Sequence, residues 1–320
     1  MGADCVRRGN EEMKIAIIGA GGIGGYFGAL LAAAGEDVRF VVRSRTLKAL
    51  REHGLTVESP VTPMQLPSVQ ATDDPSTVGP ADIVIFAVKM GDAQSAAGLL
   101  PPLLGPRTLV IPFQNGVEVA QLLSAQVAPA QVAGGVAYIP ASLRAPGVVV
   151  HGGPFARLRF GAREPVQLPA LEAFRDACKR AGIDGEIVGD IRRELWEKFV
   201  FLVGLSAMTT ATRQPVGVIR ADADMRAAFR AVMQETFDVG VAEGVGLAED
   251  FVDARLAFID TLPETMQASM LHDLQAGRPL ELPWLSGAVV RLGERHRIAT
   301  PVNRTILAVL KPFVAGSPPA

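Results

Sequence analysis

Residues 13–24 read MKIAIIGAGGIG, and this stretch indicates the fold of the first half of the chain. A short β-branched run leads into a G-x-G-x-x-G pattern formed by Gly19, Ala20, Gly21, Gly22, Ile23 and Gly24. The first glycine permits a tight turn, the second lets the backbone approach a pyrophosphate, and the third allows a helix to pack closely on the strand. Glycine-rich turns are common, but a turn between a strand and a helix at the start of the fold favours a dinucleotide site over a purely structural turn.

Apolar runs separated by helix-compatible stretches continue through the first half, as a parallel sheet with crossover helices requires. The near-continuous apolar runs 82–88 and 108–112 are typical of parallel strands buried on both faces. A further strand is predicted at 37–42, with edge strands at 132–139 and 148–151. Helices are expected at 24–34, 46–53, 92–100 and 168–181.

The pattern changes near residue 188, because from residue 191 onward nearly every window is helical. The predicted helical segments are 191–208, 222–243, 249–262, 264–276, 284–295 and 302–314. The sequence therefore predicts an α/β architecture: an N-terminal Rossmann-type dinucleotide-binding domain over 13–187 and an all-α C-terminal domain over 188–320. Residues 1–12 are expected to form a disordered extension.

Composition narrows the classes of function. The 320 residues are 49% hydrophobic and 20% charged with a net charge of −2, which is ordinary globular composition without the basic excess of a nucleic-acid binder. Four His and two Cys argue against a metal cluster and a disulfide framework, and fit a reducing cytoplasm. The longest apolar run, 199–208, is too short to span a bilayer, so no membrane partner is expected.

The end of the second predicted strand indicates which dinucleotide binds. NAD-specific sites usually place a carboxylate there to accept a hydrogen bond from the ribose, whereas this strand is followed by Arg43, Ser44 and Arg45. Guanidinium groups bind a 2′-phosphate that a carboxylate would repel. We therefore expect NADP, with Arg43 as the main contact and Ser44 or Arg45 in support. A solvated basic loop stays open as the interpretation of Arg45.

Two polar residues follow the carboxyl ends of predicted strands, where ligands bind in open α/β sheets. Lys89 follows the run 82–88, and Asn115 precedes Gly116 after the run 108–112. From the residues alone, a surface lysine and a plain Asn-Gly turn are equally good interpretations.

Lys198 and Glu281 are charged residues in apolar surroundings. The helical neighbours of Lys198 include Leu195 and Phe201, so its ammonium either extends to solvent, which the residues alone favour, or is held by a partner. Glu281, within RPLELPW at 278–284, is either a charge at a helix start or that buried partner. A buried Lys–Glu pair suits carbonyl reduction, because an ammonium stabilises and protonates the oxygen as hydride reaches the keto carbon.

Together these residues resemble the ketopantoate reductase (2-dehydropantoate 2-reductase) family. The resemblance covers residues 13 to about 312 and its most specific motifs are RELWEK at 193–198 and SMLHD at 269–273 followed by Gly277 and Glu281. It implies a Rossmann domain followed by a helical substrate domain, and NADPH-dependent reduction of a small 2-keto acid. A homodimer is left open.

The resemblance also implies roles for individual residues. Lys198 corresponds to the general acid, which also meets the substrate, and Glu281 to its supporting carboxylate. Asn115 corresponds to a residue that holds substrate near the nicotinamide, Lys89 to a strand-end residue at the cofactor, and Ser269 to the serine that binds the substrate carboxylate.

The chain departs from the family one and two helical turns after the lysine. Well-studied members carry Asn at both positions, where this chain has Leu202 and Ser206. Leucine cannot hydrogen-bond, and Ser206 could replace only part of the lost contacts. The leading interpretation is reduction of 2-dehydropantoate to pantoate for pantothenate and coenzyme A. The alternatives are a family member that reduces a different 2-keto acid, or a non-catalytic NADP(H)-binding sensor.

Overall fold

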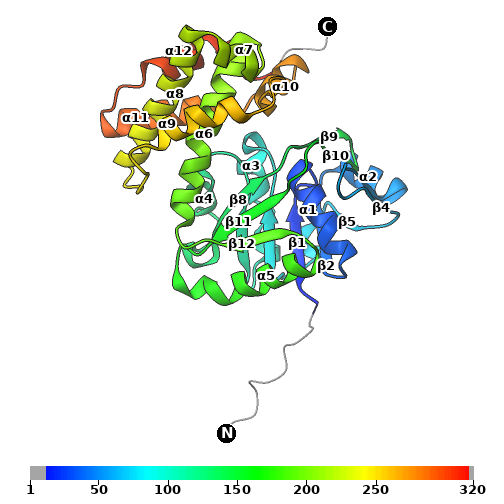
Figure 1. Ribbon diagram of the computed structural model, residues 1–320. Coiled ribbons are helices and arrows are strands. Elements are labelled where there is room, and N and C mark those ends of the chain that lie inside the picture. The colour runs from blue at the N-terminus through cyan, green and yellow to red at the C-terminus, as the bar shows by residue number, and fades with distance from the viewer. Residues whose placement is uncertain (1–11, 317–320) are drawn as a thin grey trace. The chain divides into compact units, whose positions relative to one another are not determined.

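The computed structural model describes residues 12–316, so nearly all of the extension predicted for 1–12 lies outside the described residues. The described chain forms two compact units (Figure 1). The first contains the residues up to Val88 together with Asp92–Gln114 and Leu123–Gly189. The second contains the residues from Asp190 onward together with two short segments, Lys89–Gly91 and Asn115–Leu122.

The centre of the first unit is a parallel five-stranded sheet in the order β5-β2-β1-β6-β7. Its strands are β1 (Lys14–Ile18), β2 (Asp37–Val41), β5 (Gln70–Thr72), β6 (Ile83–Phe86) and β7 (Leu109–Pro112). The chain leaves β1 toward β2 on one side and later toward β6 on the other, so the strand order reverses at β1. This is the doubly wound arrangement whose ligand crevice lies at the carboxyl ends of the strands.

The helices of the first unit are α1 (Gly22–Ala33), α2 (Ser44–His53) and α5 (Leu168–Arg180), together with most of α3 (Met90–Ala97), whereas nearly all of α4 (Val119–Leu123) belongs to the second unit. Small residues let α1 approach the sheet, since a Cβ on Gly28 would lie 2.4 Å from Ile17 and 2.7 Å from Phe40. Helix α5 buries one face through Leu171, Phe174 and Cys178.

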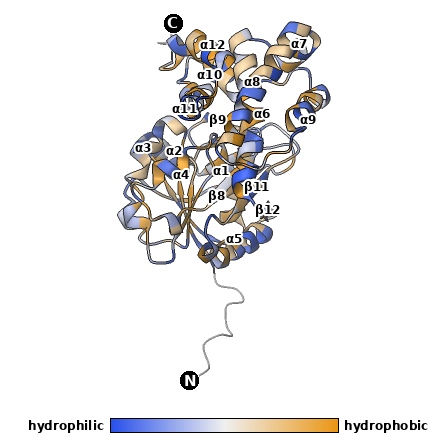
Figure 2. Ribbon diagram, turned by 90° about the vertical axis from the view of Figure 1, so that its left-hand side faces the viewer, coloured by the Kyte–Doolittle hydropathy of each residue, from blue (hydrophilic) through white to orange (hydrophobic). Residues whose placement is uncertain are grey.

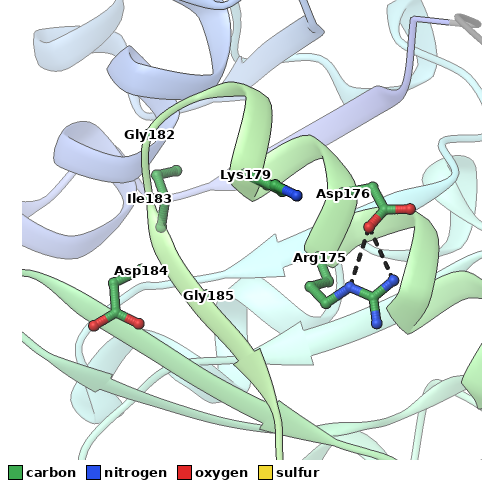
Figure 3. Close-up of a pocket in the computed structure, with 7 residues that line it drawn as sticks. All are labelled: Arg175, Asp176, Lys179, Gly182, Ile183, Asp184 and Gly185. Atoms are coloured by element: carbon green, nitrogen blue, oxygen red, sulfur yellow. Dashed lines mark hydrogen bonds and ion pairs between the residues drawn. The ribbon is translucent and has the colours of Figure 1, made fainter.

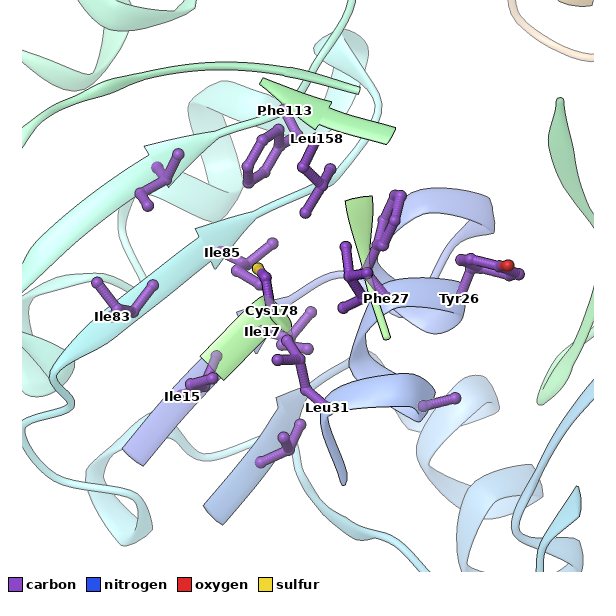
Figure 4. Packing of buried hydrophobic residues seen from close by; sticks show 14 of the residues in the cluster. Ile15, Ile17, Tyr26, Phe27, Leu31, Ile83, Ile85, Phe113, Leu158 and Cys178 are labelled. Atoms are coloured by element: carbon purple, nitrogen blue, oxygen red, sulfur yellow. The ribbon is translucent and has the colours of Figure 1, made fainter. Parts of the chain in front are cut away.

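The sheet and helices α1, α2 and α5 share one hydrophobic core, in which Ile17, Ile85, Phe27 and Leu158 are at most 1% exposed (Figure 4). The strands of the sheet accordingly appear as the most hydrophobic ribbons of this unit (Figure 2). The free thiol of Cys178 lies in this core, and burial raises its pKa to about 12.

Two smaller sheets complete the first unit, in the orders β4-β3-β10-β9 and β12-β11-β8. Their strands are β3 (Leu55–Glu58), β4 (Met64–Leu66), β8 (Gly134–Tyr138), β9 (Ala141–Ala145), β10 (Val148–His151), β11 (Arg157–Gly161) and β12 (Asp184–Ile187). The strands predicted at 132–139 and 148–151 correspond to β8 and β10 and are confirmed as strands. Their predicted place at the edge of the main sheet is wrong, because β8 pairs with β11 and β10 pairs with β3 and β9 in the two smaller sheets. The others, with β5, were not predicted, because they are three to five residues long and lack a continuous apolar run.

The second unit is helical, as predicted. Its helices are α6 (Ile191–Thr212), α7 (Val216–Ala221), α8 (Ala223–Ala242), α9 (Phe251–Phe258), α10 (Ser269–Gln275), α11 (Ser286–His296) and α12 (Pro301–Leu310). Helix α6 begins where the Asp190 carboxylate accepts a hydrogen bond from the amide of Arg193, and it packs along α8. A Cβ on Gly204 would lie 2.7 Å from Met233, so glycine permits this close helix contact.

The predicted segment 264–276 was too long at its start, since α10 begins only at Ser269 after a loop that contains Pro263. Within residues 12–316, we find no helix that combines the length and the apolar character needed to cross a membrane.

Candidate functional site

The three motif glycines of the loop between β1 and α1 are required for different reasons. Gly19 has φ of 97°, and a Cβ there would lie 2.9 Å from Val88. A Cβ on Gly24 would lie 2.0 Å from the carbonyl oxygen of Gly19, so this glycine permits the helix to pack. Gly21 differs, because the nearest neighbour of a Cβ there is the oxygen of Ala87 at 4.0 Å. The protein itself does not require glycine at position 21, whereas a ligand that approaches the backbone would.

The start of α1 is suited to an anion. Gly21 is the N-cap residue and has no side chain that could accept from the first amides of the helix, which also lack intrahelical acceptors. The next residue, Gly22, lies against the backbone of β9, since a Cβ there would be 2.6 Å from the oxygen of Ala141. Ala20 and Ile23 complete the predicted loop. Free helix amides and an open approach at Gly21 fit a dinucleotide pyrophosphate.

Arg43 is the N-cap residue of α2, and its side chain is 77% exposed. Its Nη1 and Nη2 donate to Oδ1 and Oδ2 of Asp92 at 3.1 and 2.5 Å. Ser44, the first residue of α2, and Arg45 are exposed beside it. The sequence alone did not single out Asp92, which lies three residues after Lys89 in the first turn of α3.

Lys198, Asn115 and Glu281 form a hydrogen-bonded chain within the second unit. Lys198 Nζ donates to Asn115 Oδ1 at 3.0 Å, and Asn115 Nδ2 donates to Glu281 Oε2 at 3.4 Å. The backbone amide of Met90, at the start of α3, donates to Glu281 Oε1 at 3.3 Å. Gly116, with φ of 100°, makes the turn directly after Asn115. The structure thus connects Asn115 with Lys198 and Glu281, the two residues that the sequence suggested as partners.

The electrostatic environment of Lys198 favours the neutral amine more than water does. Burial lowers the pKa of Lys198 to about 8 from its usual 10.5, and the negative charge of Glu281 opposes this effect. The lysine is held by a partner, so the sequence-based preference for an ammonium extended into solvent is wrong. An ammonium with a pKa near neutrality can donate a proton to an oxygen that gains negative charge.

A buried carboxylate holds two further cations in the same unit. The side chain of Asp273, on α10, is 8% exposed and accepts from Lys89 Nζ at 2.6 Å and from Arg278 Nε at 2.7 Å. The cations are 54% and 49% exposed, so the cluster presents a net positive charge to solvent. The sequence assigned no role to Asp273 within the SMLHD motif, because its partner Lys89 is 184 residues away. Arg278, five residues after Asp273, was given no role either.

The two serines predicted to bind substrate, Ser206 and Ser269, differ in their exposure to solvent. Ser206 is 1% exposed, and its Oγ has no hydrogen-bond partner among the described residues. Leu202, one turn earlier on α6, is half-buried, and Ser269 is exposed as the first residue of α10. Ser206 Oγ is therefore not hydrogen-bonded to Lys198, Asn115 or Glu281.

A surface depression of ≈ 580 Å³ lies at the end of α5 in the first unit (Figure 3). Its lining residues are Arg175, Asp176, Lys179, Gly182, Ile183, Asp184 and Gly185. It contains no residue that the sequence predicted, and the Arg175 guanidinium pairs with the neighbouring Asp176 at 2.9 Å. We assign no ligand to it.

The doubly wound unit, its glycine loop and the partnered lysine are features of a dinucleotide-dependent oxidoreductase. Comparison with known proteins identifies its family. The model of the ketopantoate reductase PanE/ApbA family matches residues 15–165, and the model of the family's C-terminal domain matches residues 190–314. The chain belongs to the ketopantoate reductase PanE/ApbA family. This confirms the resemblance and the fold class inferred from the sequence, and the family uses a nicotinamide cofactor.

Individual relatives cover nearly the whole chain. A 2-dehydropantoate 2-reductase of Mesorhizobium japonicum is 30% identical, over 93% of this chain and 97% of its own. The crystal structure of a PanE/ApbA family ketopantoate reductase from Ralstonia eutropha JMP134 is 33% identical with a TM-score of 0.85, over 94% of this chain and 98% of its own. A D-mandelate dehydrogenase solved with NADH and anilino(oxo)acetate, at 20% identity and a TM-score of 0.85, shares the fold over 94% of this chain and 98% of its own.

Proposed function

We propose that this protein reduces a small 2-keto acid with NADPH, and that its substrate is 2-dehydropantoate, which it converts to pantoate. The hydrogen-bonded chain from Lys198 through Asn115 to Glu281 carries the proposal. The reaction consumes one hydride and one proton: hydride adds to the keto carbon, and the oxygen takes the proton.

Lys198 is the proton donor of this proposal. Its ammonium stabilises the developing charge on the keto oxygen and then transfers a proton to it, leaving a neutral amine that the half-buried site tolerates. A pKa of about 8 keeps most of the lysine protonated at neutral pH while making the proton easier to release than from an exposed lysine.

Glu281 and Asn115 orient that proton donor. The carboxylate raises the pKa of Lys198 against the effect of burial. The Asn115 amide accepts from the ammonium on one side and donates to the carboxylate on the other, which limits the positions that Lys198 Nζ can take. Asn115 also offers an amide to a substrate that approaches the lysine.

Residues of the first unit fit the cofactor. The amides that follow Gly21 would hold the pyrophosphate, and Arg43 with Ser44 would meet the 2′-phosphate. Lys89, which follows the end of β6 and belongs to the second unit, is the further cation that we propose for the cofactor. When bound, the nicotinamide supplies the hydride.

A second candidate, reduction of a less polar 2-keto acid, is favoured by the side chains one and two turns after Lys198. Leu202 offers no hydrogen bond to a substrate hydroxyl, and Ser206 is enclosed. The cationic cluster of Lys89 and Arg278 suits the carboxylate that either substrate carries.

Turnover of a panel of 2-keto acids, followed through the oxidation of NADPH, tests both candidates. Lys198→Ala should lower kcat roughly 10²–10⁴-fold while NADPH binding changes little. Lys311→Ala, which removes an exposed lysine from the same unit, is the matched control and should leave kcat unchanged. Near-normal turnover by the Lys198 variant would refute the proton-donor role. Comparison of kcat/KM across the panel shows which of the two candidate substrates the protein prefers.

A further inference from the structure

The ion pair between Arg43 and Asp92 places opposite charges where the sequence predicts the cofactor's ribose. Arg43 follows β2, and Asp92 lies in the first turn of α3, beyond the end of β6. Both carboxylate oxygens of Asp92 accept hydrogen bonds from the Arg43 guanidinium, at 3.1 and 2.5 Å. The side chains are 77% and 39% exposed, so a ligand can reach either one.

The two side chains favour different cofactors. A guanidinium binds a 2′-phosphate through paired hydrogen bonds, whereas a carboxylate repels it and accepts from the 2′-hydroxyl of NADH instead. A phosphate that reaches Arg43 therefore also meets the negative charge of Asp92, which already occupies two of the donors of Arg43.

We propose that Asp92 determines cofactor preference by opposing Arg43, so that it narrows the advantage of NADPH and allows NADH to bind as well. The inference rests on the proposed function in one respect, the placement of Arg43 at the ribose. Because the pair is exposed, its strength is modest, and the phosphate can displace it. The expected result is a protein with a mild preference for NADPH.

Equilibrium binding of NADPH and NADH to the purified full chain tests this proposal. Asp92→Asn keeps the shape of the side chain and removes its charge, so the ratio of the Kd for NADH to that for NADPH should rise roughly threefold to tenfold. Arg43→Ala should bring the ratio to one or below. Both effects should shrink at high salt, since they act between exposed charges.

A matched control comes from another exposed pair in the same unit. Glu58 binds Arg144 through both oxygens at 2.7 Å, with side-chain exposures of 37% and 63%. Glu58→Gln removes a comparable ion pair and should leave both Kd values unchanged.

The outcomes separate this inference from the assignment of Arg43. If Arg43→Ala abolishes the preference and Asp92→Asn leaves the ratio unchanged, the role of Asp92 is refuted and the Arg43 contact stands. If Asp92→Asn weakens both cofactors equally, the residue is structural and the proposal fails. If Arg43→Ala leaves the ratio unchanged, the placement of Arg43 at the ribose fails, whatever the activity of the protein.

Discussion

The pH dependence of keto-acid reduction offers the most direct test of Lys198. The pKa of this lysine is lowered to about 8, chiefly by burial, and reduction needs its protonated form. We therefore expect kcat/KM to be level below pH 8 and to fall above it, approaching roughly tenfold per pH unit. Oxidation of the hydroxy acid by NADP⁺ needs the neutral amine and should show the opposite trend through the same pKa.

Substitution of Glu281 gives a second test, because it should shift the pH profile in a known direction. Its negative charge raises the pKa of Lys198, so Glu281→Gln should move the falling limb of reduction to lower pH. Glu264→Gln, which neutralises a glutamate 82% exposed in the same unit, should leave the limb in place. A limb that moves to higher pH, or one that persists unchanged in Lys198→Ala, would refute the assignment of the proton donor.

Stability should follow the same pKa with a defined sign. The unfolded chain binds a proton at Lys198 up to pH 10.5, whereas the folded chain releases it near pH 8, so stability rises with pH between these values. Below pH 8 the lysine costs stability in full, about 1–3 kcal/mol after allowance for solvent screening. Lys198→Met should thus raise the free energy of unfolding at neutral pH, and denaturant titration at pH 7 and pH 10 should show the gain shrinking.

Further predictions concern substrate, cofactor and the cationic cluster. Leu202→Asn should raise kcat/KM for 2-dehydropantoate relative to a 2-keto acid without a hydroxyl, by roughly tenfold if an unpaired hydroxyl costs ~1–3 kcal/mol; a ratio that falls or stays put refutes contact with substrate. Gly21→Ala should weaken NADPH binding at least about tenfold without lowering Tm, because its Cβ meets no protein atom closer than 4.0 Å, whereas Gly24→Ala should lower Tm. Asp273→Asn should destabilise the protein by about 1–3 kcal/mol and raise KM for the anionic keto acid, whereas Glu58→Gln, a surface pair, should change stability by less than ~1 kcal/mol; equal Tm losses would contradict it.

The elements that the sequence predicted well are those whose signal is local. Strands β1, β6 and β7 are near-continuous apolar runs because helices or further sheets cover both faces. A strand of that kind can be predicted from its own residues, without knowledge of the strands it pairs with. The short strands β4 and β5 have alternating or polar residues, and neighbouring strands rather than local preference stabilise them.

Only part of the candidate site could be predicted from the sequence, again because only some of its residues have a local signal. Lys198 and Glu281 were found, and considered as partners, because charge stands out in apolar surroundings, and the motif resemblance then implied their roles. Asp92 and Asp273 were given no role, since their significance lies in partners distant in sequence: 49 residues separate Arg43 from Asp92, and 184 separate Lys89 from Asp273. No periodicity encodes such a contact, and only the fold brings the charges together.

The amide of Asn115 explains why the site uses a neutral group between Lys198 and Glu281. An amide accepts from the ammonium through Oδ1 and donates to the carboxylate through Nδ2, and the reverse orientation would set NH₂ against the ammonium. An aspartate in its place would repel Glu281 and raise the pKa of Lys198, which would make the proton harder to release. A leucine would leave both charges without this link. Because Asn115 adds no charge, burial outweighs the field of Glu281, and the pKa of Lys198 stays near the pH at which a general acid is most effective.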